Sequence, residues 1–355
     1  MYKIMNRGFL FILFILLGAI SHGEAPEKTI IVIPGKDVTL GKFEKTDYPS
    51  HIIVDQALHM SKNNQGQQAI AILEDRLKVS EGYDKGYVKS RLGYVNLNSG
   101  NDLAAWEAFR EIVDGKVSAQ DDIKCDALLR SAYLQMRMKN DEKALDEFKK
   151  IVSGEFYVDS FTAADAAMRT GALLKRLNRS KDSMEVFWQI AEKCPFKDDS
   201  DFARLQVAGI LWEWGMGFYK TTLSLVERKS YYNESIKVCD MIINDPTVRD
   251  EIRAITELIH LEDFFFLGEY GKARELGEKY LEKWTPRLQD MKKSVVNGKT
   301  WSIHNCPRRQ VLSSQMWMGM IYFNLEQYQD CIEMCHKVNS DMWNASDPYK
   351  NFNVF

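Results

Sequence analysis

The chain has 355 residues, and its 47 Lys and Arg against 50 Asp and Glu give a formal net charge of −3. The two signs are interleaved and no Lys/Arg-rich run occurs, which argues against an extended surface for nucleic acid. The six cysteines are too dilute for a disulfide-built scaffold and form no Cys-x-x-Cys motif. We therefore expect no disulfide framework, no metal site and no cofactor.

The first 23 residues have the anatomy of a secretory signal peptide. Two basic residues precede an apolar run over residues 8–20, and Ser21 and Gly23 supply small residues at the cleavage-site positions. The run is short for a membrane-spanning helix, which needs roughly twenty apolar residues. We expect cleavage after residue 23, export to the periplasm or the extracellular space, and no stable membrane insertion afterwards. The alternative is a retained membrane anchor.

Residues 24–48 differ in character from the rest of the chain. The segment from Thr29 to Ile33 is short and mostly β-branched, and Pro34 and Gly35 end it as a turn. This pattern predicts a short extended arm or linker. The arm either forms one edge strand packed on the first helices or acts as a flexible tether.

Residues 49–196 carry a repeated spacing. A small residue is followed twelve positions later by Ala or Ser, and a bulky apolar residue comes four positions after that. Polar turns separate amphipathic segments within each repeat, and the repeat recurs every 36 to 39 residues. Self-similarity at this period predicts stacked helix pairs, here four regular ones. The series are Ala57, Ala69 and Leu73; Gly93, Ala105 and Phe109; Ala132, Ala144 and Phe148; and Gly171, Ser183 and Phe187.

The repeat becomes irregular after Pro195. Residues 197–283 predict two further pairs, the first with an elongated first helix, and residues 284–308 form an insertion. Residues 309–355 predict a last pair and a C-terminal tail. Cys331 and Cys335 are four residues apart on one face of its second helix, where we expect small buried hydrophobic side chains.

The spacing resembles the tetratricopeptide repeat family over residues 50–339. That family has a small residue in the first helix, then a Gly-containing turn, then an Ala and an aromatic residue in the second helix. The matching residues here are Gly93, Gly100, Ala105 and Phe109. Gly268 to Ala273 looks like the same turn and the Ala that follows it. The resemblance implies an all-α, right-handed solenoid of about six or seven antiparallel helix pairs, preceded by the extended arm.

The resemblance also implies where a partner binds, because the first helix of each pair lines a concave groove in that family. The implied lining is aromatic and Met-bearing, which suits an apolar or helical peptide segment. The alternative is that these side chains pack against a capping helix or against the N-terminal arm. The partner-binding candidates are Tyr87, Tyr94, Leu97, Leu129, Tyr133, Met136, Met168 and Lys175.

No sequence motif of catalysis accompanies the repeat. The chain has no nucleophile elbow, phosphate loop, zinc-protease helix or dinucleotide fingerprint, and His51, Asp55 and His59 share a helix face without a further metal ligand nearby. We therefore expect a non-catalytic scaffold for protein–protein interaction. One alternative is a self-associating component of an envelope assembly, using Trp212–Tyr219 and Phe264–Phe266. A less favoured one is a glycan-binding protein or an enzyme with exposed Trp side chains.

Overall fold

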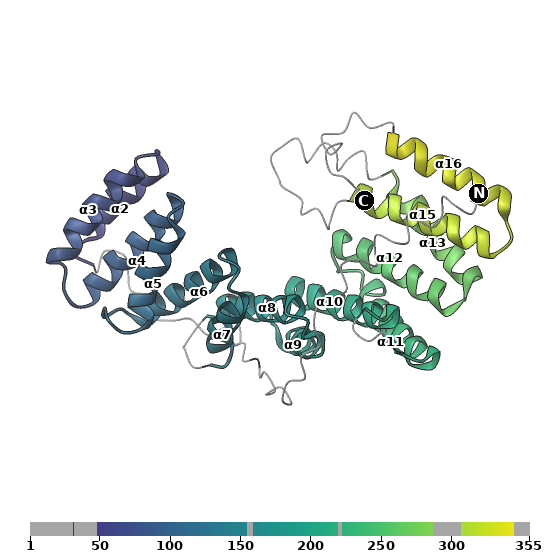
Figure 1. Ribbon diagram of the computed structural model, residues 1–355, viewed down its shortest axis with the longest axis horizontal. Coiled ribbons are helices and arrows are strands. Elements are labelled where there is room, and N and C mark those ends of the chain that lie inside the picture. Colours follow the sequence, from purple (N-terminus) through teal and green to yellow (C-terminus); the bar gives the residue numbers. More distant parts are fainter. Residues whose placement is uncertain (1–30, 32–47, 155–158, 219–221, 287–306, 344–355) are drawn as a thin grey trace. The chain divides into compact units, whose positions relative to one another are not determined.

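The all-α prediction is confirmed. The computed structural model describes residue 31 and residues 48–154, 159–218, 222–286 and 307–343, and every regular element in these ranges is a helix (Figure 1). The signal-peptide prediction falls outside the described residues, as does most of the predicted insertion. Of the predicted edge strand only Ile31 is described; it has no regular structure, and its backbone N–H donates to Gln189 Oε1 at 2.9 Å.

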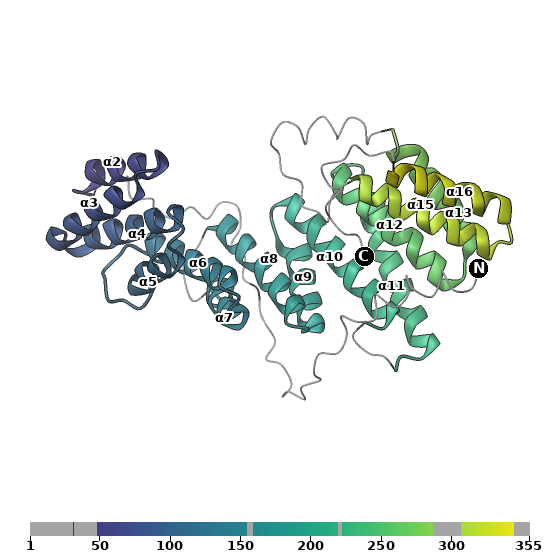
Figure 2. The same ribbon diagram turned by 45° about the horizontal axis from the view of Figure 1, so that its top comes forward.

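The described chain divides into two compact units, residues 27–203 and residues 204–355. The N-terminal unit holds four consecutive helix pairs, and each helix packs on the next one in the chain (Figures 1 and 2). These pairs are α2 (His51–Lys62) with α3 (Gly66–Val79), α4 (Gly82–Asn98) with α5 (Asp102–Val113), α6 (Asp121–Arg137) with α7 (Asp141–Val152), and α8 (Ser160–Arg176) with α9 (Ser180–Lys193).

The boundary between the units falls within α10 (Lys197–Met216). The C-terminal unit continues with further pairs, and no helix in the described part of the chain has the length and apolar character needed to cross a bilayer. Its helices are α11 (Leu225–Ile243), α12 (Asp250–Leu267), α13 (Tyr270–Trp284), α15 (Pro307–Asn324) and α16 (Tyr328–Trp343). Within this unit α11 packs on α12, α12 on α13, α13 on α15 and α15 on α16.

Two of the regular pairs are closed by a contact between a glycine of the first helix and the aromatic ring of the second. A Cβ added at Gly93 would lie 2.7 Å from the ring of Phe109, and one at Gly171 would lie 2.7 Å from that of Phe187. Ordinary carbon contacts need about 3.5–4 Å. Both rings are fully buried, so the missing side chain is what allows the two helices to approach each other so closely.

The turns inside the pairs share one backbone conformation. Gly100, Lys139 and Asn178 have φ of 77°, 61° and 59°, and each follows the first helix at the equivalent position. The N–H groups of the left-handed residue and of its successor bond back to carbonyls of the last turn, as for Gly100 N–H to Leu97 O at 3.1 Å. This arrangement satisfies carbonyls that a helix end leaves without partners.

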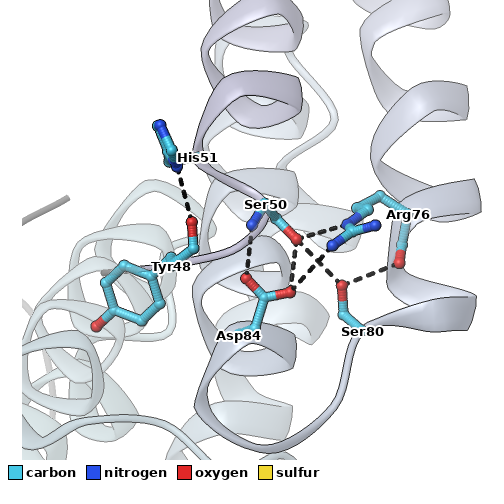
Figure 3. Close-up of polar contacts among 6 residues, drawn as sticks. All are labelled: Tyr48, Ser50, His51, Arg76, Ser80 and Asp84. Carbon is cyan, nitrogen blue, oxygen red and sulfur yellow. Dashed lines mark hydrogen bonds and ion pairs between the residues drawn. The ribbon is translucent and has the colours of Figure 1, made fainter. Parts of the chain in front are cut away.

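A buried polar cluster fixes the start of the array (Figure 3). The N–H and hydroxyl of Ser50, which precedes α2, donate to Asp84 Oδ1 and Oδ2 at 3.0 and 2.5 Å. Arg76 Nε of α3 donates to the Ser50 hydroxyl at 2.6 Å, and Ser80 Oγ lies 3.3 Å from it. Ser50 has no exposed surface, so this cluster ties α2, α3 and α4 together and offers a substrate no access.

Of the two predicted self-association surfaces, the segment Phe264–Phe266 lies largely in the core, whereas the aromatic side chains described in the other are half-buried. Phe264 and Phe265 are buried, and Phe266 stacks on Tyr232 with ring centroids 5.4 Å apart. Trp212, on α10, is half-buried and packs against Phe218 at 6.1 Å. The apolar run on α12 therefore fills the space between neighbouring helices, which is why its periodicity alone did not distinguish it from an exposed patch.

The expectation for the last cysteine pair is wrong for Cys335, which is exposed, while Cys331 is half-buried. Cys335 occupies the position that Phe109, Phe148 and Phe187 occupy in earlier pairs, and all three of those rings are buried. The difference arises because α16 belongs to the last described pair, so no further helix pair covers it.

The C-terminal unit buries acidic groups on α12. Burial raises the pKa of Glu262 to about 8, although a hydrogen bond from Trp317 opposes the shift, and burial also raises the pKa of Asp263 well above its usual value. A carboxyl whose pKa is raised on folding binds more protons in the folded state than in the unfolded one. Its contribution to stability is therefore complete below the unfolded pKa and is lost as pH rises through the folded value.

We predict that the C-terminal unit loses stability between about pH 4.5 and pH 8, by up to about 1.4 kcal/mol per pH unit for each such group. Glu262→Gln removes the ionisation while keeping the shape, so it flattens this dependence and raises the urea midpoint at pH 8. Glu234→Gln, at an exposed position on α11, serves as the control and leaves the profile unchanged. Parallel pH profiles for wild type and Glu262→Gln would contradict the prediction.

Candidate functional site

The predicted groove residues all lie on the first helices α4, α6 and α8, but their accessibility differs. Tyr87 and Leu129 are buried, so neither offers a partner an open surface. Tyr87 stacks on Tyr48, which precedes α2, with centroids 4.2 Å apart and planes 8° apart. At Tyr87 the structure therefore shows the alternative interpretation, in which the side chain packs against the N-terminal part of the chain. The half-buried candidates are Tyr94, Leu97, Tyr133, Met136, Met168 and Lys175.

Tyr94 is held by two residues of the next first helix. Its hydroxyl lies 2.7 Å from both carboxylate oxygens of Asp126 and donates to them, while Arg130 Nε donates to the same hydroxyl at 2.9 Å. The Arg130 guanidinium lies 5.2 Å from the centre of the Tyr94 ring. The ring itself packs edge-on against Phe109 at 5.5 Å. The phenol therefore connects α4 to α6.

The same three side chains meet again one repeat later. The Tyr133 hydroxyl donates to Asp165, and Arg169 Nε donates to that hydroxyl at 3.0 Å. The guanidinium lies 5.3 Å from the ring centre, and the ring packs edge-on against Phe148 at 5.5 Å. We call each set a Tyr–Asp–Arg contact. Because Asp and Arg are four residues apart on one helix, they share the face that meets the preceding Tyr.

The electrostatics keep both phenols protonated. Burial, then the charge and hydrogen bond of Asp126, raise the pKa of Tyr94 above its usual range. Burial and the bond to Asp165 raise the pKa of Tyr133 to about 12. Both hydroxyls therefore remain hydrogen-bond donors throughout the physiological pH range, and their polar capacity is used in joining helices.

The sequence analysis missed the arginines of these contacts. Arg130 and Arg169 stand 39 positions apart, and Arg91 stands at the same interval before them, with its guanidinium 5.1 Å and 5.5 Å from the rings of Tyr87 and Tyr94. A signal existed in the pattern of Tyr, Asp 32 positions later and Arg 36 positions later, which occurs from Tyr94 and from Tyr133. The repeated spacing described above is counted only from the small residue of each first helix, so it does not include this pattern.

The arginines are also partly accessible charged groups of this face. The side chains of Arg130 and Arg169 are 38% and 46% exposed. Within the described residues, the hydrogen bonds of both groups engage Nε, and a guanidinium carries five N–H donors in all. The terminal nitrogens can therefore meet a ligand. Leu97, Met136 and Met168 are half-buried apolar side chains on the same three first helices. We call these five residues the inner row.

A polar depression of about 480 Å³ between α5 and α7 is the other candidate. Its charges neutralise one another: Arg110 pairs with Asp114 at 2.5 Å and with Glu147 at 3.2 Å, and burial raises the pKa of Glu147. Trp106 and several Lys and acidic side chains complete its walls. Because its Arg110 is already paired with two carboxylates, the depression is less suited than the inner row to recognising a charged partner.

The comparisons with known proteins concern the repeat. A tetratricopeptide repeat model matches residues 126–153, which cover most of α6 and all of α7. No curated protein matches the chain. The register of this match is the one that recurs in the other pairs, because the left-handed turn residue Lys139 has counterparts in Gly100 and Asn178.

Two solved structures are similar to the chain. One is a tetratricopeptide repeat protein from Parabacteroides merdae, with 15% sequence identity and a TM-score of 0.44, covering 82% of this chain and 93% of that one. The other is the apo form of the quorum sensor NprR from B. thuringiensis, with 9% identity and a TM-score of 0.39, covering 82% of this chain and 87% of that one.

We predict that Tyr133→Phe lowers the free energy of unfolding by about 1 kcal/mol, because it removes a hydrogen bond to a carboxylate that remains partly open to water. The measurement is the urea midpoint of the far-ultraviolet circular dichroism signal. Tyr83→Phe is the matched control, since that ring is 55% exposed. An unchanged midpoint for Tyr133→Phe would show that the phenol does not join the two helices.

Proposed function

We propose that the chain is a tetratricopeptide repeat protein and that it is a non-catalytic scaffold, which holds a peptide or protein segment against the inner row. Proteins built of this repeat bind protein or peptide partners, and the family match lies on the middle pair of the row. The observation that carries the proposal is the repetition itself. A guanidinium recurs at the same place on consecutive first helices, each time over a Tyr ring of the preceding first helix.

The construction of the stack supports binding by a rigid surface. Each exposed guanidinium is held over a Tyr ring and bonded through Nε, so its terminal nitrogens are already oriented before a ligand arrives. Preorganised side chains lose less conformational entropy on binding than mobile ones. Arginine also pairs with carboxylates in a bidentate geometry.

The proposed partner segment therefore differs from the one expected from the sequence. Tyr94 and Tyr133 join neighbouring helices. The proposed contact surface therefore consists of Arg130, Arg169 and the apolar side chains beside them. A segment that suits this surface carries carboxylates for the guanidinium groups and apolar side chains for Met136 and its neighbours. Lys175, half-buried near the end of α8, adds a further cation to the predicted surface.

We further propose that the scaffold works outside the cytoplasm, in the periplasm or the extracellular space. The support for this proposal is the basic start, apolar run and small-residue cleavage site of the first 23 residues. The inner row itself is independent of this placement, because none of its residues belongs to that segment.

We predict that Arg130→Gln with Arg169→Gln reduces recovery of the native partner by at least about tenfold, since each lost charged pair is worth about 1–3 kcal/mol. The measurement is quantitative mass spectrometry after affinity capture by the tagged full chain. Gln keeps a polar side chain of similar reach, so the helical circular dichroism signal should not change.

The matched control is Lys143→Gln with Lys150→Gln, two exposed cations on α7 of the same unit. We expect this variant to recover the partner as well as wild type does. The assignment to the inner row is wrong if the Arg variant recovers the partner fully. If the Lys variant loses the partner, the binding surface lies on the second helices instead.

A further inference from the structure

Two of the described cysteines share one face of α16. Cys331 is half-buried and Cys335 is exposed, and both are free thiols in the part of the chain that the structure describes. Because they are four residues apart on a helix, their Cβ atoms are about 5–6 Å from each other. The other described cysteines lie singly on α6, at the end of α9 and on α11, so only these two come together.

The thiol of Cys335 lies against the backbone of the neighbouring helix. A Cβ added at Gly319 of α15 would lie 3.7 Å from Cys335 Sγ, so the sulfur packs where α15 has no side chain. Met316 and Met320, within one turn of Gly319, carry thioethers and are 58% and 43% exposed. Thioethers and thiolates are both soft ligands, so this pair of helices presents soft donors to the solvent.

The two thiols interact with each other. Burial, then the charge of Cys335 and a hydrogen bond with it, raise the pKa of Cys331. The first thiolate to form therefore opposes the formation of the second. A cation bound between the two sulfur atoms removes this repulsion, and its binding releases the protons that the thiols carry.

The helix geometry favours a bridging ion over a disulfide. A disulfide holds its two Cβ atoms about 3.5–4.5 Å apart, which is less than the spacing of about 5–6 Å on a helix. A direct bond between Cys331 and Cys335 would therefore distort α16. A metal ion between the two sulfur atoms lengthens the bridge, so the helix keeps its conformation.

The number of donors decides which ion fits. No group of three or more His, Cys, Asp or Glu side chains suited to a metal occurs among the described residues. Zinc does not fit, because structural zinc sites are built from four such ligands. Cu(I) is a soft ion that thiolates select, and a pair of thiolates is enough to hold it.

We propose that Cys331 and Cys335 bind one Cu(I) ion between their sulfur atoms. Each thiol gives its proton to the solvent as its bond to the metal forms, and no electron is transferred, because the ion arrives as Cu(I). The site departs from the expectation from the sequence, which included no metal site. It uses no residue of the inner row, so it does not depend on the proposed function.

We predict that the reduced full chain takes up one equivalent of Cu(I) in competition with bicinchoninate, a chromophoric Cu(I) chelator, in the absence of oxygen. Cys335→Ser should weaken this binding by at least about a hundredfold, because only one thiolate of the pair is left. Cys194→Ser is the matched control. It alters a half-buried thiol at the end of α9, so this variant should bind Cu(I) as tightly as wild type does.

The pH dependence provides a readout that a change in folding alone would not produce. Because two thiol protons leave for each ion bound, the affinity of wild type should rise by up to about a hundredfold per pH unit between about pH 6 and pH 7. Cys331→Ser leaves one thiol of the pair, so its affinity should rise by only about tenfold per unit. Far-ultraviolet circular dichroism checks that both variants keep their helical content.

The proposal is overturned if Cys335→Ser binds Cu(I) as tightly as wild type does. It is also overturned if mass spectrometry of the chain, purified from its native compartment without reductant, finds Cys331 or Cys335 in a disulfide with each other or with Cys306. Binding that is lost equally in Cys194→Ser would place the ion elsewhere on the chain and would equally overturn it.

Discussion

The structure depends on one contact, in which an aromatic ring of the second helix lies directly over a residue of the first helix that has little or no side chain. Gly93 under Phe109 and Gly171 under Phe187 leave no space for a Cβ. This contact sets the separation of the two helices in a pair. The pair then presents an apolar surface that it cannot bury alone, so the next pair must cover it.

The polar ties between pairs follow from that geometry. Once consecutive first helices are in register, Tyr94 meets Asp126 and Arg130, and the same meeting recurs one repeat later. The Tyr hydroxyls form hydrogen bonds that join consecutive first helices, while the guanidinium groups keep N–H donors directed outward. The proposed binding surface is therefore what remains exposed after the stack has been built. In the last described pair, Ile332 and Cys335 are exposed, and no further pair covers them among the described residues.

The fold was predictable from the sequence because its determinants are local and periodic. The position of Gly93 relative to Phe109 encodes helix contact directly, and the antiparallel pairs followed from it. The site was predictable only in part. The family resemblance placed Tyr94 on the inner side, but it could not show that Asp126 and Arg130 engage the hydroxyl, since those residues belong to the next repeat. Burial of Tyr87 under Tyr48 depends on the segment before α2, which lies outside the repeat pattern.

Amide hydrogen exchange of a Gly93→Val variant tests the central claim most directly. A side chain at this position must displace the Phe109 ring, at a cost of about 1–3 kcal/mol. We expect the amides of α4 and α5 to exchange at least about fivefold faster than in wild type, since 1.4 kcal/mol corresponds to a factor of ten. In the control Gly271→Val, where an added Cβ meets nothing within 4 Å, α4 and α5 should keep their protection. Unchanged protection of α4 and α5 in Gly93→Val would contradict the account.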